Sequence, residues 1–194
     1  MWNSQAKTYD KYLRPLRWSQ SKLVSLLELA KNATLLDLAC GTGWAVRYAA
    51  DSANGRGEFY GIDIASEVID KAETDSVNYE NVHFRKANAE KLPFDSDFFD
   101  YIICSNAFHH FSDPDKVAKE AYRVLKPRGR ICILDTTADS FIIRLLDRLE
   151  RKLERGHVKI YSTEEYWALF RGAGLLYITR KSIMLPMKIH IGEK

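Results

Sequence analysis

The sequence of 194 residues is poor in cysteine and lacks any Cys-x-x-Cys pair. Its three cysteines are Cys40, Cys104 and Cys132. An odd number of cysteines, each in or beside a predicted strand, argues against a disulfide framework and for buried, reduced thiols. We therefore expect a cytoplasmic protein without structural disulfides.

Long apolar runs are also missing. No segment approaches the roughly 18 residues of a membrane span, and the polar start Met1–Ser4 is not typical of a signal peptide. The histidines His109 and His110 are adjacent rather than one helical turn apart, which argues against a metal site. Since no repeat, low-complexity stretch or linker interrupts the chain, we expect residues 1–194 to form one domain.

Net charge is small but unevenly distributed. The chain carries a formal charge of +3, and its pI near 8.7 falls short of the basic footprint of a nucleic-acid-binding protein. Residues 1–140 hold 18 basic and 20 acidic side chains, whereas residues 141–194 hold 11 and 6. Much of this late basic charge lies in residues 140–156, whose apolar positions form one helical stripe: Ile142, Leu145, Leu146, Leu149 and Leu153.

Two interpretations of the basic amphipathic segment 140–156 remain. The favoured one is a helix that covers the sheet with its apolar stripe and exposes a solvated outer face. The alternative is a helix that lies on a membrane surface or on an acidic partner.

The most informative segment that the sequence does contain runs from Leu35 to Ala45. Apolar residues around an acid predict a buried strand, and Gly41 and Gly43 follow it directly before a helix-like run. Glycine has no Cβ, so a ligand can approach the backbone closely. The amides that open the next helix favour negative charge. The segment therefore predicts a site for a nucleotide-like cofactor.

The residues around this loop narrow the kind of cofactor. Val46 stands where a dinucleotide fingerprint has its third glycine, and no Walker lysine follows. Asp63, twenty residues past Gly43, ends a second apolar run and is placed to accept both ribose hydroxyls of an adenosine. Asp37 suits a positively charged ligand better than a pyrophosphate. Together these residues indicate a cationic adenosine derivative, of which S-adenosylmethionine is one.

Strand-like and helix-like segments alternate along the chain, which predicts an α/β fold with a mainly parallel sheet covered on both faces. A capping box at Ser162–Glu165 begins the last helix, and Gly172 is expected to end it. Strands are expected near 34–39, 58–63, 81–85, 99–104, 130–135 and 174–180, with a last one near 183–191. Helices are expected near 4–13, 19–30, 43–51, 65–75, 114–125, 139–155 and 163–171.

Four blocks of the sequence, in order, resemble the motifs of class I S-adenosylmethionine-dependent methyltransferases, in particular the small-molecule, type 11 or quinone-methyltransferase-like members. The blocks are Asp37–Gly43, Phe84–Phe94, Phe99–Phe111 and Arg123–Arg130. The resemblance implies a single-domain Rossmann-like fold with a seven-stranded sheet and a C-terminal antiparallel strand, part of whose hairpin would come from Met184–Ile191. One departure is Arg128, because the family prefers glycine there; we expect only a local effect.

The resemblance also assigns roles to residues of the cofactor site. It places Asp37 at the loop and the methionine end of the cofactor, and Asp63 at the ribose. Ile64 would pack on the adenine ring, although an ordinary core residue would look the same. Asn88, where the family usually has Asp, and Ala89 would meet the adenine edge. The expected set is completed by Ala39, Gly41, Gly43, Ser105, Tyr9 and Glu90, the last of which is equally consistent with a surface role.

The catalytic group is harder to assign. Methyl transfer from a sulfonium is an in-line displacement in which proximity and orientation supply much of the acceleration, and the cofactor carries the hard chemistry. A base is useful for phenol, hydroxyl or ammonium acceptors, and histidine titrates in the right range. His109 and His110 are the candidates, with a structural or substrate-packing role as the alternative.

The acceptor is expected to be a small molecule. Residues 1–31 would contribute to its pocket, residues 32–135 would bind the cofactor, and residues 136–194 would form a C-terminal helix and hairpin half. The Asn/Asp-Pro-Pro-aromatic corner of DNA amino-methyltransferases is absent from Ser105–Phe108, which disfavours nucleobases of that kind. A sensor without turnover, or an enzyme that transfers another group of the same cofactor, remains an alternative.

Overall fold

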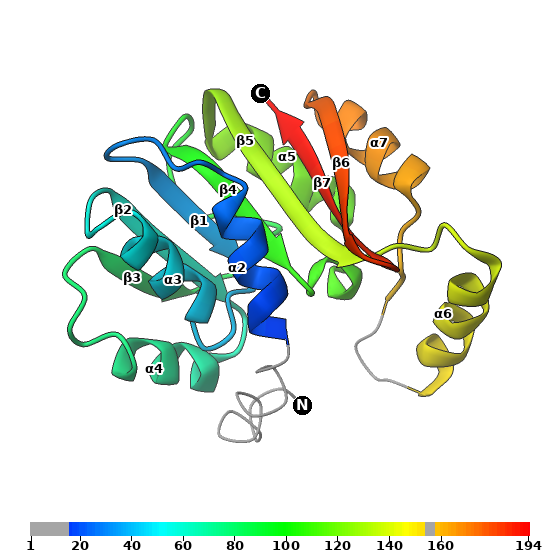
Figure 1. Ribbon diagram of the computed structural model, residues 1–194, viewed down its shortest axis with the longest axis horizontal. Helices are drawn as coiled ribbons and strands as arrows, with labels where there is room; N and C mark the ends of the chain where they lie inside the picture. The colour runs from blue at the N-terminus through cyan, green and yellow to red at the C-terminus, as the bar shows by residue number, and fades with distance from the viewer. Residues whose placement is uncertain (1–15, 154–157) are drawn as a thin grey trace.

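The computed structural model describes residues 16–153 and 158–194 (Figure 1). The predicted helix over 4–13, which includes Tyr9, lies outside these ranges. The last two residues of the predicted helix 139–155 lie outside them as well. The strands are β1 (Thr34–Leu38), β2 (Glu58–Asp63), β3 (Val82–Lys86), β4 (Phe99–Ser105), β5 (Leu125–Thr136), β6 (Leu176–Met184) and β7 (Met187–Glu193). The helices are α2 (Arg17–Ser25), α3 (Trp44–Ser52), α4 (Ser66–Thr74), the short 3-10 helix η3 (Phe108–His110), α5 (Pro114–Val124), α6 (Phe141–Leu153) and α7 (Thr163–Gly172).

The strands form one seven-stranded sheet in the order β3-β2-β1-β4-β5-β7-β6. Strands β1 to β5 pair in parallel, whereas β7 runs antiparallel to both β5 and β6 (Figure 1). The predicted mainly parallel sheet with a C-terminal antiparallel strand is therefore confirmed. In the register, Leu38 pairs with both Ile62 and Cys104, so the carboxyl ends of β1, β2 and β4 meet at one edge.

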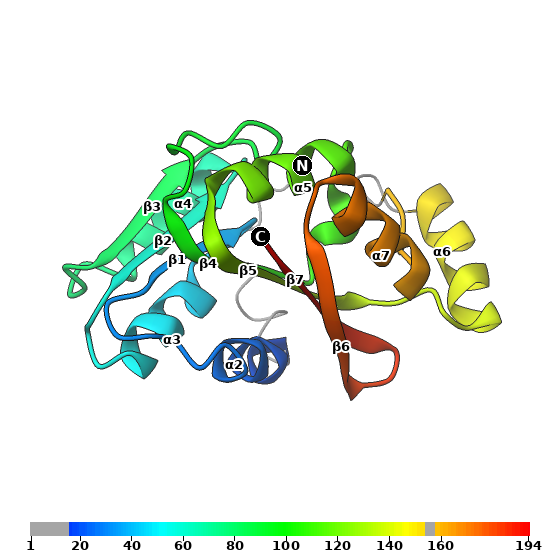
Figure 2. The same cartoon turned by 90° about the horizontal axis from the view of Figure 1, so that it is seen from above.

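Helices cover both faces of the sheet, as predicted (Figure 2). Because successive side chains of a strand point to opposite faces, Leu35 and Leu36 enter different cores. One core joins the sheet to α2, α3 and α4 through residues such as Leu23 and Val46. The other joins it to α5 and α7 through residues such as Phe170. A strand buried on both faces explains the unbroken apolar runs of the sequence.

Helix α2 is shorter at its end than the predicted helix over 19–30. The amide of Leu27 bonds to the carbonyl of Val24 at 3.1 Å, which tightens the last turn. Glu28 and Asn32 then adopt left-handed φ angles of 47° and 62° and turn the chain into β1. The periodicity of apolar residues does not predict such a turn, and no glycine marks it in the sequence.

The capping box of α7 is confirmed, since Ser162 Oγ accepts from Glu165 N–H and the Glu165 carboxylate accepts from Ser162 N–H at 2.8 Å. The helix ends at Gly172, as expected. The left-handed residue that reverses the chain is Gly174, with φ of 89°.

Helix α6 does not cover the sheet, and the favoured interpretation of segment 140–156 is wrong. Figures 1 and 2 both place α6 at the outer end of the molecule, away from the sheet. Ile142, Leu145, Leu146 and Leu149 of its apolar stripe are exposed to solvent, whereas Asp147 is buried. The amphipathic pattern was correct, but the sequence does not show which way the helix faces.

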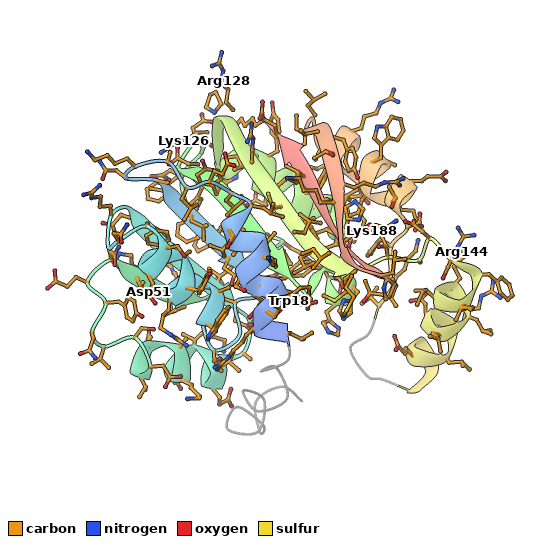
Figure 3. All side chains as sticks on the ribbon, viewed as in Figure 1. Trp18, Asp51, Lys126, Arg128, Arg144 and Lys188 are labelled. Carbon is orange, nitrogen blue, oxygen red and sulfur yellow. The ribbon has the colours of Figure 1, made fainter. Side chains whose placement is uncertain are left out.

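An irregular turn within β5, between the paired residues Leu125 and Arg130, explains the departure at Arg128. This residue adopts a left-handed φ of 67° and projects from the turn into solvent (Figure 3). A side chain in this conformation costs about 1–2 kcal/mol, which is why glycine suits the position. The turn lies at the end of β5 opposite to the carboxyl edge of the sheet, so its effect is local.

We expect Arg128→Gly to raise the free energy of unfolding by roughly 0.5–1 kcal/mol, because relief of the left-handed strain exceeds the added entropy of the unfolded chain. Urea denaturation measures the change. Arg128→Ala is the matched control, since it removes the charge but keeps the Cβ. An equal gain in both variants would show that charge, not strain, is responsible.

His190 on β7 is fully buried and stacks on Tyr166 with ring centroids 4.1 Å apart. Its Nδ1 lies 2.9 Å from the Tyr177 hydroxyl. Burial lowers the pKa of His190 from 6.5 to about 4. Between these two pH values His190 is therefore protonated in the unfolded chain and neutral in the folded chain.

We expect the free energy of unfolding to fall as the pH drops from 6.5 towards 4, with a His190 contribution of up to about 1.4 kcal/mol per pH unit. His190→Gln should flatten this part of the stability profile, measured by urea denaturation at several pH values. His83→Gln serves as the control, because the His83 side chain is 45% exposed. An unchanged slope in His190→Gln would contradict the assignment.

Candidate functional site

A cavity of about 280 Å³ opens at the carboxyl ends of the first four strands. Such crevices are where open α/β sheets bind ligands. The residues that line it follow β1, β2, β3 and β4: Ala39, Ile62, Asp63, Ile64, Ala65, Val68, Ala87, Asn88, Ala89, Glu90, Asn106, Ala107, His110, Phe111 and Ser112. Six residues expected at the cofactor site are among them, together with one of the two histidines.

The glycine loop forms one wall of the site through three left-handed residues, Ala39, Gly41 and Gly43, with φ of 57°, 54° and 75°. Gly43 also allows close packing, because a Cβ there would lie 2.3 Å from the Cζ of Phe84 on β3. Ala39 adopts the same strained conformation with a side chain, and it lines the cavity. Gly41 and Gly43 shape the loop but do not line the cavity.

The Asp63 carboxylate links the glycine loop to the turn before α4. Its Oδ2 accepts from Gly41 N–H at 3.0 Å, and its Oδ1 accepts from Ala65 N–H at 3.0 Å. Burial raises the pKa of Asp63, and the two amides partly oppose this rise. Each carboxylate oxygen keeps a further lone pair, so the group can accept two hydroxyl donors from a ligand.

Two buried polar atoms at the same edge lack a hydrogen-bond partner among the described residues. They are the Oδ1 of Asp37, at the end of β1, and the Nδ2 of Asn106, just after β4. Strands β1 and β4 are direct neighbours. Burial, with a smaller contribution from Asp63, raises the pKa of Asp37 well above its usual value. An unpaired acceptor and an unpaired donor are costly in a folded chain unless a ligand satisfies them.

Further lining residues follow β2 and β3. Ile64 is 65% exposed and lines the cavity, so it is not an ordinary core residue. Asn88 Oδ1 accepts from Glu90 N–H at 2.9 Å, which leaves the Asn88 amide group as a donor. Glu90 accepts from the Asp113 N–H at 3.2 Å, at the start of α5. Glu90 therefore supports the fold and also lines the site.

Ser105 does not line the cavity but receives a hydrogen bond from Gln20 Nε2 at 3.1 Å. This contact joins α2 to the end of β4. Gln20, Asn106 and Asp135 are site residues that sequence reasoning missed. Asn106 follows a predicted strand and has a left-handed φ of 54°, which asparagine tolerates, and this was the only available signal.

The two histidines occupy different places. His109 Nδ1 lies 2.8 Å from Asp135 Oδ1, and the His109 amide donates to Asp135 Oδ2 at 3.1 Å. A carboxylate only accepts, so Nδ1 carries the hydrogen and Nε2 is the basic nitrogen. His110 lines the cavity, and its ring centroid lies 4.0 Å from that of His109.

Comparison with known families decides the kind of site. A family model described as a methyltransferase domain matches residues 29–176. The chain belongs to the class I S-adenosylmethionine-dependent methyltransferases.

Two bacterial methyltransferases illustrate the relationship. The methyltransferase YcgJ of Bacillus subtilis is 31% identical over 170 residues, which are 86% of this chain and 66% of that protein. Its crystal structure superposes with a TM-score of 0.77, and the match covers 85% of this chain and 72% of the other. Demethylmenaquinone methyltransferase of Bacillus licheniformis is 33% identical over 68% of this chain and 59% of its own length. This chain therefore spans 59% to 66% of the length of these curated relatives.

Within residues 16–153 and 158–194, no three His, Cys, Asp or Glu side chains group in a way that could hold a metal ion. None of the helices in the described part of the chain has the length and apolar character needed to cross a bilayer.

We expect Asp63→Ala to weaken S-adenosylmethionine binding by at least about tenfold, because a hydrogen bond to a charged acceptor contributes roughly 1.5–3 kcal/mol. Isothermal titration calorimetry measures the loss. Asp70→Ala is the matched control, since Asp70 is an exposed carboxylate on α4 and does not line the cavity. Unchanged affinity in Asp63→Ala, with the fold intact by circular dichroism, would contradict the ribose assignment.

Proposed function

We propose that this protein transfers a methyl group from S-adenosyl-L-methionine to a small-molecule acceptor and releases S-adenosyl-L-homocysteine. The observation that carries the proposal is the pair of unsatisfied buried atoms, Asp37 Oδ1 and Asn106 Nδ2. An acceptor and a donor at one edge complement the ammonium and carboxylate of an amino acid. Asp63 beside them complements a ribose. S-adenosylmethionine carries all three groups.

The residues present fit this cofactor along its whole length. Asp37 and Asn106 would hold the methionine end, and Ala39 and Gly41 would bring the backbone close to it. Asp63 would hold the ribose. Ile64 would cover one face of the adenine, and Asn88 and Ala89 would meet its edge. The negative charge of the two aspartates also favours the positive sulfonium.

When bound, the cofactor supplies an electrophilic methyl group on a sulfonium. The chain's own contribution is to bind and orient the reactants and to exclude water. The Asp63 carboxylate is already held by the amides of Gly41 and Ala65, so this group needs little rearrangement on binding.

A proton that leaves the acceptor needs a base. We assign this role to His110, because its side chain lines the cavity. His109 is a positioning residue, since its ring is held by Asp135 and packs against His110. This pairing fixes the ring of His109 and thereby the orientation of its neighbour.

The acceptor proposed for this site is small and partly apolar. Among the described residues, α6 is the one helix between β5 and α7, which leaves little chain at this place for binding a folded protein substrate. Ala107 and Phe111 give the cavity wall after β4 an apolar character. The relative named demethylmenaquinone methyltransferase supports a quinone-like acceptor as the first class to test. Residues 1–31 and 136–194 are proposed to complete the acceptor side, and the three buried thiols fit work in the cytoplasm.

Two measurements test the proposal. Calorimetric titration with S-adenosylmethionine and S-adenosylhomocysteine tests the cofactor site. If neither compound binds, the proposal is refuted. A screen with methyl-labelled cofactor over quinols, phenols, amines and tRNA then tests turnover. Tight cofactor binding without label transfer to any acceptor would identify a sensor instead of a methyltransferase.

We expect His110→Gln to lower kcat by about 100-fold with the best acceptor of that screen, because a general base contributes at least this factor. Cofactor affinity should stay within about threefold. The acid limb of the pH–rate profile, where the base takes up a proton, should disappear.

His109→Gln is the matched comparison, since it keeps a donor towards Asp135 but removes the imidazole. It should lower kcat less than His110→Gln and shift the acid limb rather than abolish it. If His109→Gln alone removes the acid limb, the roles of the two histidines are reversed.

A further inference from the structure

Helix α6 carries a continuous apolar face that is open to solvent. Its five large apolar side chains on this face are between 45% and 79% exposed: Phe141, Ile142, Leu145, Leu146 and Leu149. At 100° per residue these positions fall on one side of the helix. An amphipathic helix of a globular domain normally turns such a stripe towards the core. Here the stripe faces outward.

The opposite side of α6 is the side that the protein holds. Asp147 is 4% exposed, and its Oδ1 accepts from Ile160 N–H at 2.8 Å. Asp147 lies about 140° around the helix from Ile142 and 200° from Leu149, so it is on the far side from the apolar stripe. Helix α6 therefore turns Asp147 towards the protein and its apolar side chains towards solvent, the reverse of the usual orientation.

Exposed charges lie at both edges of the stripe: Arg148 is next to Phe141 on one edge, and Glu150 is next to Leu146 on the other. Arg144 is also exposed, and Figure 3 shows it on α6 at the outer end of the molecule. Residues 140–156 hold five basic against three acidic side chains, and residues 141–194 hold 11 against 6. An apolar helical face in a segment of net basic charge is the pattern of a helix that lies in the interface of a membrane. Anionic lipid headgroups complement this charge.

A second copy of the chain suits this face less well. Thirteen residues of helix extend roughly 20 Å, which is too little surface for the roughly 800 Å² per partner of a stable dimer. The small area therefore favours a lipid surface over a second copy.

We propose that α6 is a docking helix that binds this protein to the surface of an anionic lipid bilayer. The apolar stripe enters the boundary between headgroups and acyl chains, while Arg144 and Arg148 contact the headgroups.

The docking helix is connected to the candidate active site. The chain returns from α6 at Val158 and Lys159, whose amides donate to the carbonyl of His109 at 3.0 and 3.1 Å. If the acceptor is a lipophilic molecule, which rests on the proposed function, docking would bring the cavity to the phase in which that molecule dissolves. The docking itself does not depend on methyl transfer.

Co-sedimentation with vesicles tests the proposal directly. The probes are vesicles of 70% phosphatidylcholine with 30% phosphatidylglycerol, and vesicles of phosphatidylcholine alone. We expect the wild-type protein to bind the anionic vesicles at least about tenfold more tightly. The double variant L145S/L149S should lose at least about tenfold in affinity for them. Arg148→Gln should lose about fivefold.

The matched control is V77S/L176S, which removes two apolar side chains that are 74% and 66% exposed but lie outside α6. It should bind vesicles like the wild type. Thermal melts and calorimetric cofactor binding should be unchanged in every variant, because the replaced side chains are exposed and outside the cavity. These two readouts separate a failure of docking from a failure of the proposed function.

Three results would overturn the proposal. They are absence of wild-type binding to anionic vesicles, equal binding by L145S/L149S and wild type, and a wild-type dimer that L145S/L149S converts to a monomer by light scattering while neither binds vesicles. The last result would identify the face as a contact between copies of this chain. Equal affinity for both vesicle types would refute the role of the arginines.

Discussion

The carboxylate of Asp63 is the contact on which the candidate site depends. It lies at the end of β2 and accepts one amide from the glycine loop and one from the start of α4. One side chain thus links the loop after β1 to the turn after β2. The remaining lone pairs of the same carboxylate are what a ribose would use. The group therefore serves the fold and stays available to a ligand, at a place where burial raises its pKa.

The parallel sheet supplies the second constraint. Strands β1, β2 and β4 end at one edge, so Asp37, Asp63 and Asn106 come from distant parts of the chain to a common place. Apolar layers on both faces hold these strands rigidly. Polar groups that would be costly in such surroundings persist only at that edge, where a ligand can satisfy them. The unpaired atoms of Asp37 and Asn106 follow from this arrangement.

Much of the fold was predictable because its signals are local. The apolar runs, the capping box at Ser162 and the glycine loop each depend on neighbouring residues, and they predicted the strands, the start of α7 and the cofactor edge. Asp63 was predicted from its distance to the glycines, and Ile64 from the family resemblance. Gln20 and Asp135 were missed, because their roles come from contacts 85 and 26 residues away in the sequence. The orientation of α6 was missed for a different reason. An amphipathic pattern shows that one face needs a cover, but not what provides it.

The three cysteines lie on the two sides of the sheet, so they can report on local unfolding of each helical layer. Cys104 belongs to the core beneath α5 and α7, whereas Cys40 and Cys132 belong to the core beneath α2, α3 and α4. All three are buried free thiols. A thiol reagent can reach each one only when the layer above it separates from the sheet. The native chain thus carries a chemical reporter on each side, and the relative labelling rates of Cys104 and Cys132 would show which layer of helices detaches first.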